Sequence, residues 1–235
     1  MAQPNAAHPE GAAETETALP VAAARFVRAE HLAAGYSPAR HMALTLTIGF
    51  ALATLAVRLA VHARPVDWVL APFFLVVANL IEWMVHRYPM HHPQPPRMMY
   101  RNHTLLHHLA FTHGQMPITR PAELGLVMMP WYTMIGIFMV TSPLIVVAGL
   151  LRGPGLAGIF LLAAVAYFLS YETLHSLYHL PDTTLNRLGV GRWRSFRALQ
   201  AHHTHHHVLG RMAHVNFNVT IPLMDLVLGT KERGD

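Results

Sequence analysis

The stretch GLAGIFLLAAVAYFLSYETLHSLYH, from Gly155 to His179, joins the two features that decide the fold of this chain. It begins with an apolar run about as long as the ~20 residues that an α-helix needs to cross a bilayer. It ends in a histidine pair, His175 and His179, whose i, i+4 spacing places both rings on one face of a helix. Imidazole is the commonest metal ligand in proteins. The stretch therefore predicts a membrane helix that carries metal ligands at its end.

Three further apolar stretches have a similar length. The four expected spans cover about residues 42–61, 66–85, 124–150 and 155–173, the third with a kink near Pro143. The connectors at 62–65 and 152–154 leave room only for hairpin turns. The sequence therefore predicts an all-α integral membrane protein with four transmembrane helices in two hairpins.

The composition agrees with a membrane protein. Only 12% of the residues are charged, 53% are hydrophobic and the mean hydropathy is +0.30, whereas about a quarter of a soluble domain is charged. The absence of cysteine excludes disulfides, thiolate zinc sites and Cys-ligated iron–sulfur clusters. Residues 1–24 are expected to be a disordered tail without a signal peptide, and 25–235 the membrane domain, with a short interfacial helix within 25–40.

The basic residues predict the orientation in the membrane. Segments 1–41, 86–123 and 174–235 share one side and carry 3, 4 and 7 Lys or Arg, against one in each opposite turn, Arg64 and Arg152. The positive-inside rule places the richer side in the cytoplasm. Because all four histidine clusters lie in these segments, we expect a cytosolic, helical, histidine-rich cap. The arginines follow the membrane topology, and no nucleic-acid partner is expected.

Most of the nineteen histidines fall into four clusters: His86, His91 and His92; His103, His107 and His108; His175 and His179; and His202, His203, His205, His206 and His207. His103 and His107 are expected to share one metal, with His108 turned about 100° away toward a second. The last cluster offers two registers, 202/205/206 or 203/206/207. One register completes ten imidazoles, which suits two metals with about five ligands each.

Two carboxylates stand beside these clusters. Glu82 precedes His86 by four residues and Glu172 precedes His175 by three, so each is expected to accept a hydrogen bond from a ligating ring. A carboxylate-bridged di-iron bundle needs two Glu-x-x-His motifs, and this chain has one, so we reject that architecture. The remaining histidines are expected to be surface or structural residues: His8, His31, His41, His62, His113 and His214.

The order and spacing of the histidine boxes resemble the fatty acid hydroxylase/sterol desaturase superfamily. The resemblance covers about residues 70–232 and includes the ending NFNVT (216–220), PLMD (222–225) and Gly229-Thr230. The positions that match the family ligands are His86, His91, His103, His107, His108, His175, His179, His203, His206 and His207. The register of the last three follows from their distance before the NFNVT run. His92, His202 and His205 stand outside the simplest pattern.

The resemblance implies a chemistry. Members of this family use a histidine-ligated di-metal centre, normally two irons, with O2 and two electrons to oxidise a C–H bond of a lipid drawn from the bilayer. Hydroxylation is the leading expectation and desaturation the alternative. Zinc in isolated protein would be a substitute, because zinc has no redox states and outcompetes ferrous iron at nitrogen ligands.

The electrons must come from a separate donor. The chain has no cysteine, and no Gly-x-Gly-x-x-Gly run follows an expected strand to form the fingerprint of a flavin or nicotinamide site, so we expect a ferredoxin or cytochrome with its reductase. Arg192, Arg194 and Arg197 are expected to dock that donor or to contact lipid headgroups. A membrane metal transporter or metal-binding protein is the alternative from another class, although the clusters lie outside the spans, whereas transporters place their ligands near the midplane.

Overall fold

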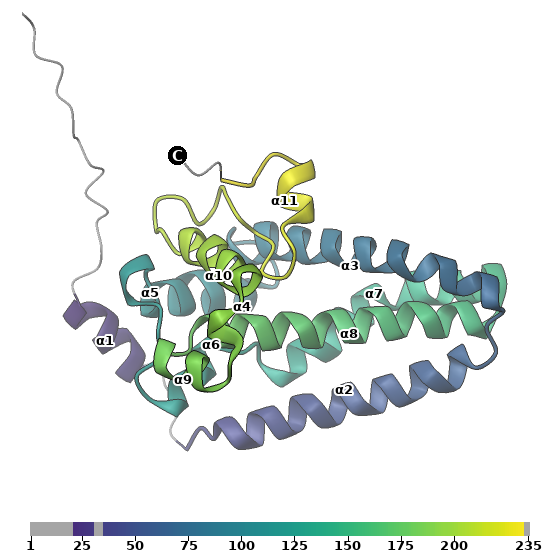
Figure 1. Ribbon diagram of the computed structural model, residues 1–235, viewed down its shortest axis with the longest axis horizontal. Helices are drawn as coiled ribbons and strands as arrows, with labels where there is room; N and C mark the ends of the chain where they lie inside the picture. Colours follow the sequence, from purple (N-terminus) through teal and green to yellow (C-terminus); the bar gives the residue numbers. More distant parts are fainter. Residues whose placement is uncertain (1–20, 31–34, 233–235) are drawn as a thin grey trace, which may run out of the picture.

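The computed structural model describes residues 21–30 and 35–232, and the regular structure within these ranges is entirely helical. Four long helices lie side by side: α2 (Pro38–Ala60), α3 (Ala71–Val85), α7 (Trp131–Arg152) and α8 (Pro154–Tyr178) (Figure 1). Short helices gather at one end: α1 (Val21–Glu30), α4 (Arg97–Tyr100), α5 (His108–Ala110), α6 (Leu124–Val127), α9 (Asp182–Arg187), α10 (Arg194–His206) and α11 (Leu223–Val227). The tighter or wider turns are η1 (Pro65–Leu70), η2 (His86–Met90), η3 (Arg101–His107), η4 (His113–Gln115), η5 (Pro121–Glu123) and η6 (Val190–Arg192).

Four helical segments are long and apolar enough to cross a membrane, as the sequence predicted. They cover Pro38–Ala60, Pro65–Met90, Pro121–Arg152 and Pro154–Tyr178. In the last of them, which contains α8, 61% of an apolar 18-residue stretch is buried inside the protein. The buried share of the corresponding stretch is 11–22% in the other three. Helix α8 is therefore the central element, and the other three expose large apolar side chains in the way that lipid-facing helices do.

The third predicted span is not one continuous helix. Helix α6 ends at Val127, Met128 has an extended backbone with ψ 140°, and α7 begins after Pro130. Pro130 keeps the helix from resuming at once, because its ring disfavours a helical conformation at Met129, the residue before it. By contrast, α7 continues through Pro143. The hydroxyl of Ser142 donates to the Met139 carbonyl, the group that a backbone N–H at position 143 would otherwise bond.

The N-terminal boundaries also differ from the prediction. Helix α1 begins at Val21, inside the segment expected to be a tail, and α2 begins at Pro38, where the Ser37 hydroxyl accepts from the Arg40 backbone N–H. Residues 1–20 of the expected tail, with His8, and residues 31–34, with His31, lie outside the described residues.

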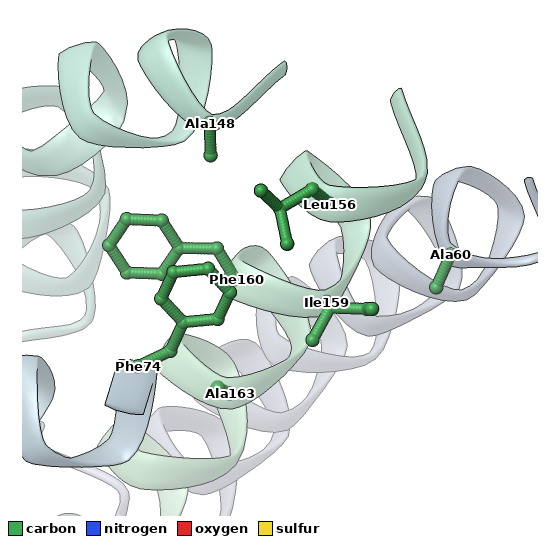
Figure 2. Packing of buried hydrophobic residues seen from close by; sticks show 7 residues of the cluster. All are labelled: Ala60, Phe74, Ala148, Leu156, Ile159, Phe160 and Ala163. Carbon is green, nitrogen blue, oxygen red and sulfur yellow. The ribbon is translucent and has the colours of Figure 1, made fainter. Parts of the chain in front are cut away.

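Apolar packing fixes α8 among its neighbours. The rings of Phe74 on α3 and Phe160 on α8 stack with centroids 4.5 Å apart, and Leu156 and Ile159 pack beside them (Figure 2). At Gly158 the backbone of α2 comes so close that an added Cβ would lie 2.3 Å from the Ala60 nitrogen. Small residues permit such close approach of membrane helices. The C-terminal end of α8, which carries two histidines, therefore starts from a fixed support.

Candidate metal centre

The ten histidines that the sequence singled out converge into two adjacent groups. We call His86, His91, His103, His108 and His206 the first ligand group, and His107, His175, His179, His203 and His207 the second ligand group. Within each group the ring nitrogens that could bind a metal all lie within 4.8 Å of one another, and all ten residues are buried. The structure thus shows two histidine clusters, each of which could hold a metal ion.

The cluster of His103, His107 and His108 is divided between the two ligand groups in a different way from the prediction. His103 and His107 were expected to share a metal, but His103 joins His108 in the first ligand group while His107 joins the second. The reason is local: η3 is a π-helical turn, which pairs residues five apart instead of four. His86 and His91 also stand five apart, across the π-helical turn η2, and share the first ligand group.

Ordinary α-helical spacing builds most of the second ligand group. His175 and His179 come from the end of α8, and His203 and His207 from the end of α10, each pair four residues apart. The Nε2 atom of His107 lies 3.2 Å from that of His175 and 3.2 Å from that of His207. His206 projects from α10 to the first ligand group, so α10 supplies both groups.

The geometry separates the two registers of the last box. His203, His206 and His207 point into the ligand groups. The Nε2 atom of His202 lies 3.1 Å from Asp225 Oδ2, and His205 lies on the outside of α10 with its Nδ1 3.6 Å from Glu232 Oε2. His92 is exposed and donates from Nδ1 to the Arg87 carbonyl at 2.8 Å. These three extra rings belong to neither group.

Backbone carbonyls orient the ligand rings. The Nδ1 atoms of His107, His179 and His206 donate to the carbonyls of Leu126, Met116 and Val215 at 2.8, 2.9 and 2.8 Å, and those of His86 and His207 donate to Phe217 and Phe111. A ring that carries its proton on Nδ1 presents a bare lone pair at Nε2. Five rings are thus held with Nε2 aimed inward.

The two carboxylates do not play the role expected of them. Glu82 accepts from the Val219 backbone N–H at 2.7 Å and from the hydroxyls of Tyr167 and Thr220 at 2.5 and 2.7 Å. Glu172 accepts from the Met129 backbone N–H at 3.3 Å. Among the described contacts neither bonds a ligand ring, and the Nδ1 of His86 instead meets a carbonyl. Sequence spacing along one helix could not predict the carbonyl that accepts from His86, because it belongs to Phe217 in a distant loop.

Burial keeps the rings uncharged. It lowers the pKa of His179 to about 4, and it lowers the pKa of His91 as well. For the other ligands outside the spans, burial first and then repulsion between neighbouring rings hold the pKa well below its usual range: His103, His107, His108, His203, His206 and His207. At neutral pH these rings are neutral, with a proton on one nitrogen only, which is the form that binds a metal.

One nitrogen pair itself favours a cation between its members. The Nε2 atoms of His107 and His207 are 3.2 Å apart. Because both rings donate from Nδ1 to a backbone carbonyl, this short distance brings two lone pairs together. A divalent ion, which binds imidazole nitrogen at about 2.0–2.1 Å in the case of zinc, would turn that repulsion into coordination.

Two pockets adjoin the ligand groups. An apolar pocket of ≈ 710 Å³, open mouth included, lies between α3, α7 and α8; Phe138, Phe160 and Phe168 line it and His86 stands at one side. A second pocket of ≈ 830 Å³, open mouth included, is lined by several methionines and by His103, His107 and His175, so it touches both ligand groups. Met90, Met129 and Tyr171 line both pockets.

Comparisons with protein-family models, with curated proteins and with solved structures found no match to this chain.

Proposed function

We propose that this protein is a membrane-bound oxygenase that hydroxylates an unactivated C–H bond of a lipid, using O2 and two electrons. The observation that carries the proposal is that His86, a ring of the first of two buried five-histidine groups, lines an apolar pocket that lies among three candidate spans. A polar or charged substrate would gain nothing from such a pocket, whereas an acyl or isoprenoid chain would bury its length there.

The ligand set fits two metal ions, one in each group, and the proposed metal is iron. Iron bound there would supply the redox chemistry that activates O2 and oxidises the C–H bond. Zinc fits the same nitrogen ligands but has no redox states, so zinc in purified protein would be a substitute.

The chain's own residues contribute three further functions. The loop carbonyls aim the ring nitrogens, as described above. Phe138, Phe160 and Phe168 exclude water from the pocket between the spans. Met90 and Met129, which line both pockets, stand where an apolar chain would pass from the spans toward the ligand groups.

The proposed sidedness is cytoplasmic, because all ten ligands lie in segments 86–123 and 174–235, which carry most of the arginines. A separate ferredoxin or cytochrome, with its reductase, would deliver electrons there. Arg192 and Arg194 are exposed and suit an acidic carrier. Arg197 is less available, because it donates to Asp182 at 2.6 Å and to the Gly191 carbonyl at 2.8 Å.

The position of the ligand groups disfavours metal transport. Both groups are built at and beyond the ends of α3 and α8, and the apolar pocket between the spans holds one histidine, His86. A transporter would place its ligands near the middle of the bilayer, where an ion must be carried across.

The test uses the full chain in lipid nanodiscs, loaded with ferrous iron and supplied with a chemical reductant, O2 and a total lipid extract. Mass spectrometry of the lipids is expected to show a gain of one oxygen. Loss of two hydrogens would indicate the desaturase alternative. Unchanged lipids, together with metal uptake into liposomes, would refute the oxygenase proposal.

A matched pair of variants connects any activity to the site. His179→Ala removes a buried ring of the second ligand group, whereas His92→Ala removes an exposed ring that belongs to neither group. Activity and bound iron are expected to fall only in His179→Ala. Equal loss in both variants would show that the products do not depend on this metal centre.

A further inference from the structure

Two segments far apart in the chain supply four of the five carbonyls that orient the ligand rings, and Leu126 supplies the fifth. Segment 110–117 provides Phe111, the acceptor for His207, and Met116, the acceptor for His179, both in the second ligand group. Segment 215–220 provides Val215, the acceptor for His206, and Phe217, the acceptor for His86, both in the first ligand group. Each ligand group thus depends on its own loop.

A buried arginine from the N-terminal helix holds segment 110–117. Arg28 on α1 donates from Nε to the Ala110 carbonyl at 2.7 Å, and from its two terminal nitrogens to the carbonyls of Gln115 and Pro117 at 2.5 and 3.0 Å. These three carbonyls stand directly before Phe111 and on either side of Met116. The guanidinium also lies 4.3 Å from the centre of the Phe111 ring. Arg28 therefore contacts the neighbours of both acceptors at once.

The charge of Arg28 is balanced within the same site. Its guanidinium lies 3.2 Å from Glu123 Oε2, and both side chains are almost fully buried. Glu123 in turn accepts from the Thr119 backbone N–H at 2.8 Å, so the same ion pair also fixes the backbone that follows segment 110–117. Removal of one partner from a buried pair of this kind leaves an uncompensated buried charge, which is strongly destabilising. The folded state therefore favours the Arg28–Glu123 contact.

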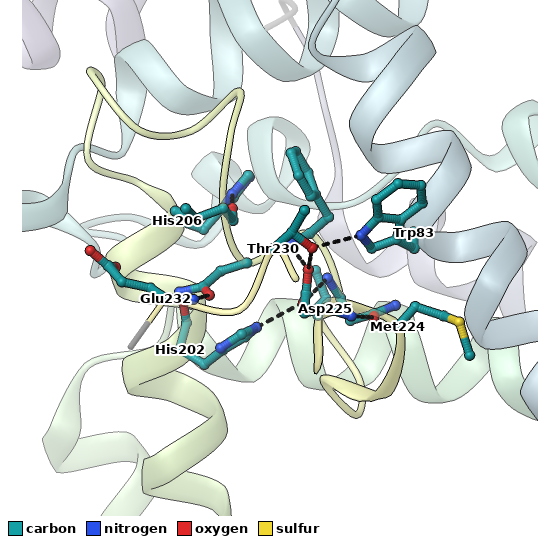
Figure 3. A network of polar contacts seen from close by, with 12 residues as sticks. Trp83, His202, His206, Met224, Asp225, Thr230 and Glu232 are labelled. Carbon is teal, nitrogen blue, oxygen red and sulfur yellow. Dashed lines mark hydrogen bonds and ion pairs between the residues drawn. The ribbon is translucent and has the colours of Figure 1, made fainter. Parts of the chain in front are cut away.

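A buried aspartate holds segment 215–220. Asp225 on α11 accepts from the backbone N–H groups of Phe217 and Asn218 at 2.9 and 2.8 Å, and from the Thr230 hydroxyl at 2.7 Å. Figure 3 shows this network, in which Thr230 also accepts from the Trp83 indole at 2.9 Å. Because Asp225 fixes the peptide of Phe217, it fixes the loop whose carbonyls meet His86 and His206.

We propose that Arg28 and Asp225 are positioning residues with separate targets: Arg28 orients the second ligand group through segment 110–117, and Asp225 orients the first through segment 215–220. This inference rests on the metal ligation proposed above, but not on the lipid chemistry. It assigns the N-terminal helix α1, which bears no ligand, to the assembly of the metal centre. Loss of a residue that orients a metal ligand typically costs 10–100-fold in metal affinity.

The experiment measures each ligand group alone. His206→Ala removes one of the five rings of the first ligand group and leaves the second complete, whereas His179→Ala does the reverse, so the tighter Co²⁺ binding step in each background is expected to report the complete group. The full chain in nanodiscs is titrated with Co²⁺, whose visible absorption reports its ligands. In the His206→Ala background, Arg28→Gln is expected to weaken Co²⁺ binding by roughly 10–100-fold and Asp225→Asn to leave it within about twofold. In the His179→Ala background we expect the reverse: Asp225→Asn weakens Co²⁺ binding by roughly 10–100-fold, and Arg28→Gln leaves it within about twofold.

Matched controls separate positioning from general stability. Arg120→Gln removes an exposed arginine that also pairs with Glu123, at 3.4 Å, and Asp182→Asn removes an exposed aspartate that pairs with Arg197 at 2.6 Å. Both are expected to leave Co²⁺ affinity unchanged in either background. Arg28→Lys keeps the charge but cannot hold three carbonyls in the planar guanidinium geometry, so we expect incomplete recovery.

The outcomes are distinct. Selective weakening, with helix content unchanged by circular dichroism, supports the inference even if no lipid is oxidised. Equal weakening of both groups by Arg28→Gln, no weakening, or full affinity in Arg28→Lys would overturn the role of Arg28. Asp225→Asn acting on both groups or on neither would overturn the role of Asp225. Failure of the wild type to bind Co²⁺ would overturn the inference and the proposed metal centre together.

Discussion

Gly158→Ala tests whether the close approach of α2 and α8 holds the bundle together. The new Cβ would lie 2.3 Å from the Ala60 nitrogen and 2.7 Å from the Ala56 carbonyl oxygen. Ordinary contact begins near 3.4 Å, so the helices must separate by about 1 Å, and no side-chain rotation can relieve a clash with backbone. Overpacking costs about 1–3 kcal/mol, and we expect the upper end here. Alanine recovers about 1 kcal/mol of helix propensity.

The expected net loss is about 2 kcal/mol of unfolding free energy, or roughly a thirty-fold change in the equilibrium. The assay is equilibrium unfolding in mixed micelles with increasing dodecyl sulfate, followed by circular dichroism. Gly136→Ala on α7 is the control, because nothing lies within 4 Å of its added Cβ, and it is expected to stabilise by about 0.5–1 kcal/mol. If Gly158→Ala were as stable as that control, the packing argument would be refuted.

Three further predictions follow from single side chains. His207→Ala is expected to lower the metal bound per chain while His205→Ala does not, as measured by elemental analysis; equal metal content would contradict the ligand groups. Phe160→Ala removes one of two stacked rings and is expected to cost about 3–5 kcal/mol in the micelle assay, so a loss below about 1 kcal/mol would show that the stack contributes little. Tyr167→Phe leaves Glu82 short of one donor and is expected to cost about 1–3 kcal/mol, whereas unchanged stability would mean that another donor replaces the hydroxyl.

The sequence was sufficient where the governing property is local. The four spans follow from apolar length alone, because a bilayer imposes one requirement on any helix that crosses it. The pairs His175 and His179, and His203 and His207, follow from α-helical spacing. The break at Met128–Pro130 also had a local signal in Pro130, which the continuous apolar composition concealed.

The sequence was insufficient where the answer depends on backbone form or on distant segments. His103 and His107 fall into different ligand groups because η3 is a π-helical turn. The spacing of the residues does not predict such a turn. The acceptor for His86 lies 131 residues away, at Phe217. Arg28 stood in a segment expected to form an interfacial helix, and only the folded chain brings it against loop 110–117.

The two ligand groups differ in how they are mechanically linked to the membrane. Helix α8 runs for 25 residues without a break, about 37 Å of rigid rod, and ends in His175 and His179 of the second ligand group. Helix α3 gives way to the π-helical turn η2 at His86, so the first ligand group is joined to its candidate span through a change of helix type. Membrane helices respond to a change in bilayer thickness by tilting. A tilt of α8 would move His175 and His179 together, so we expect the geometry of the second ligand group to depend on the thickness of the bilayer.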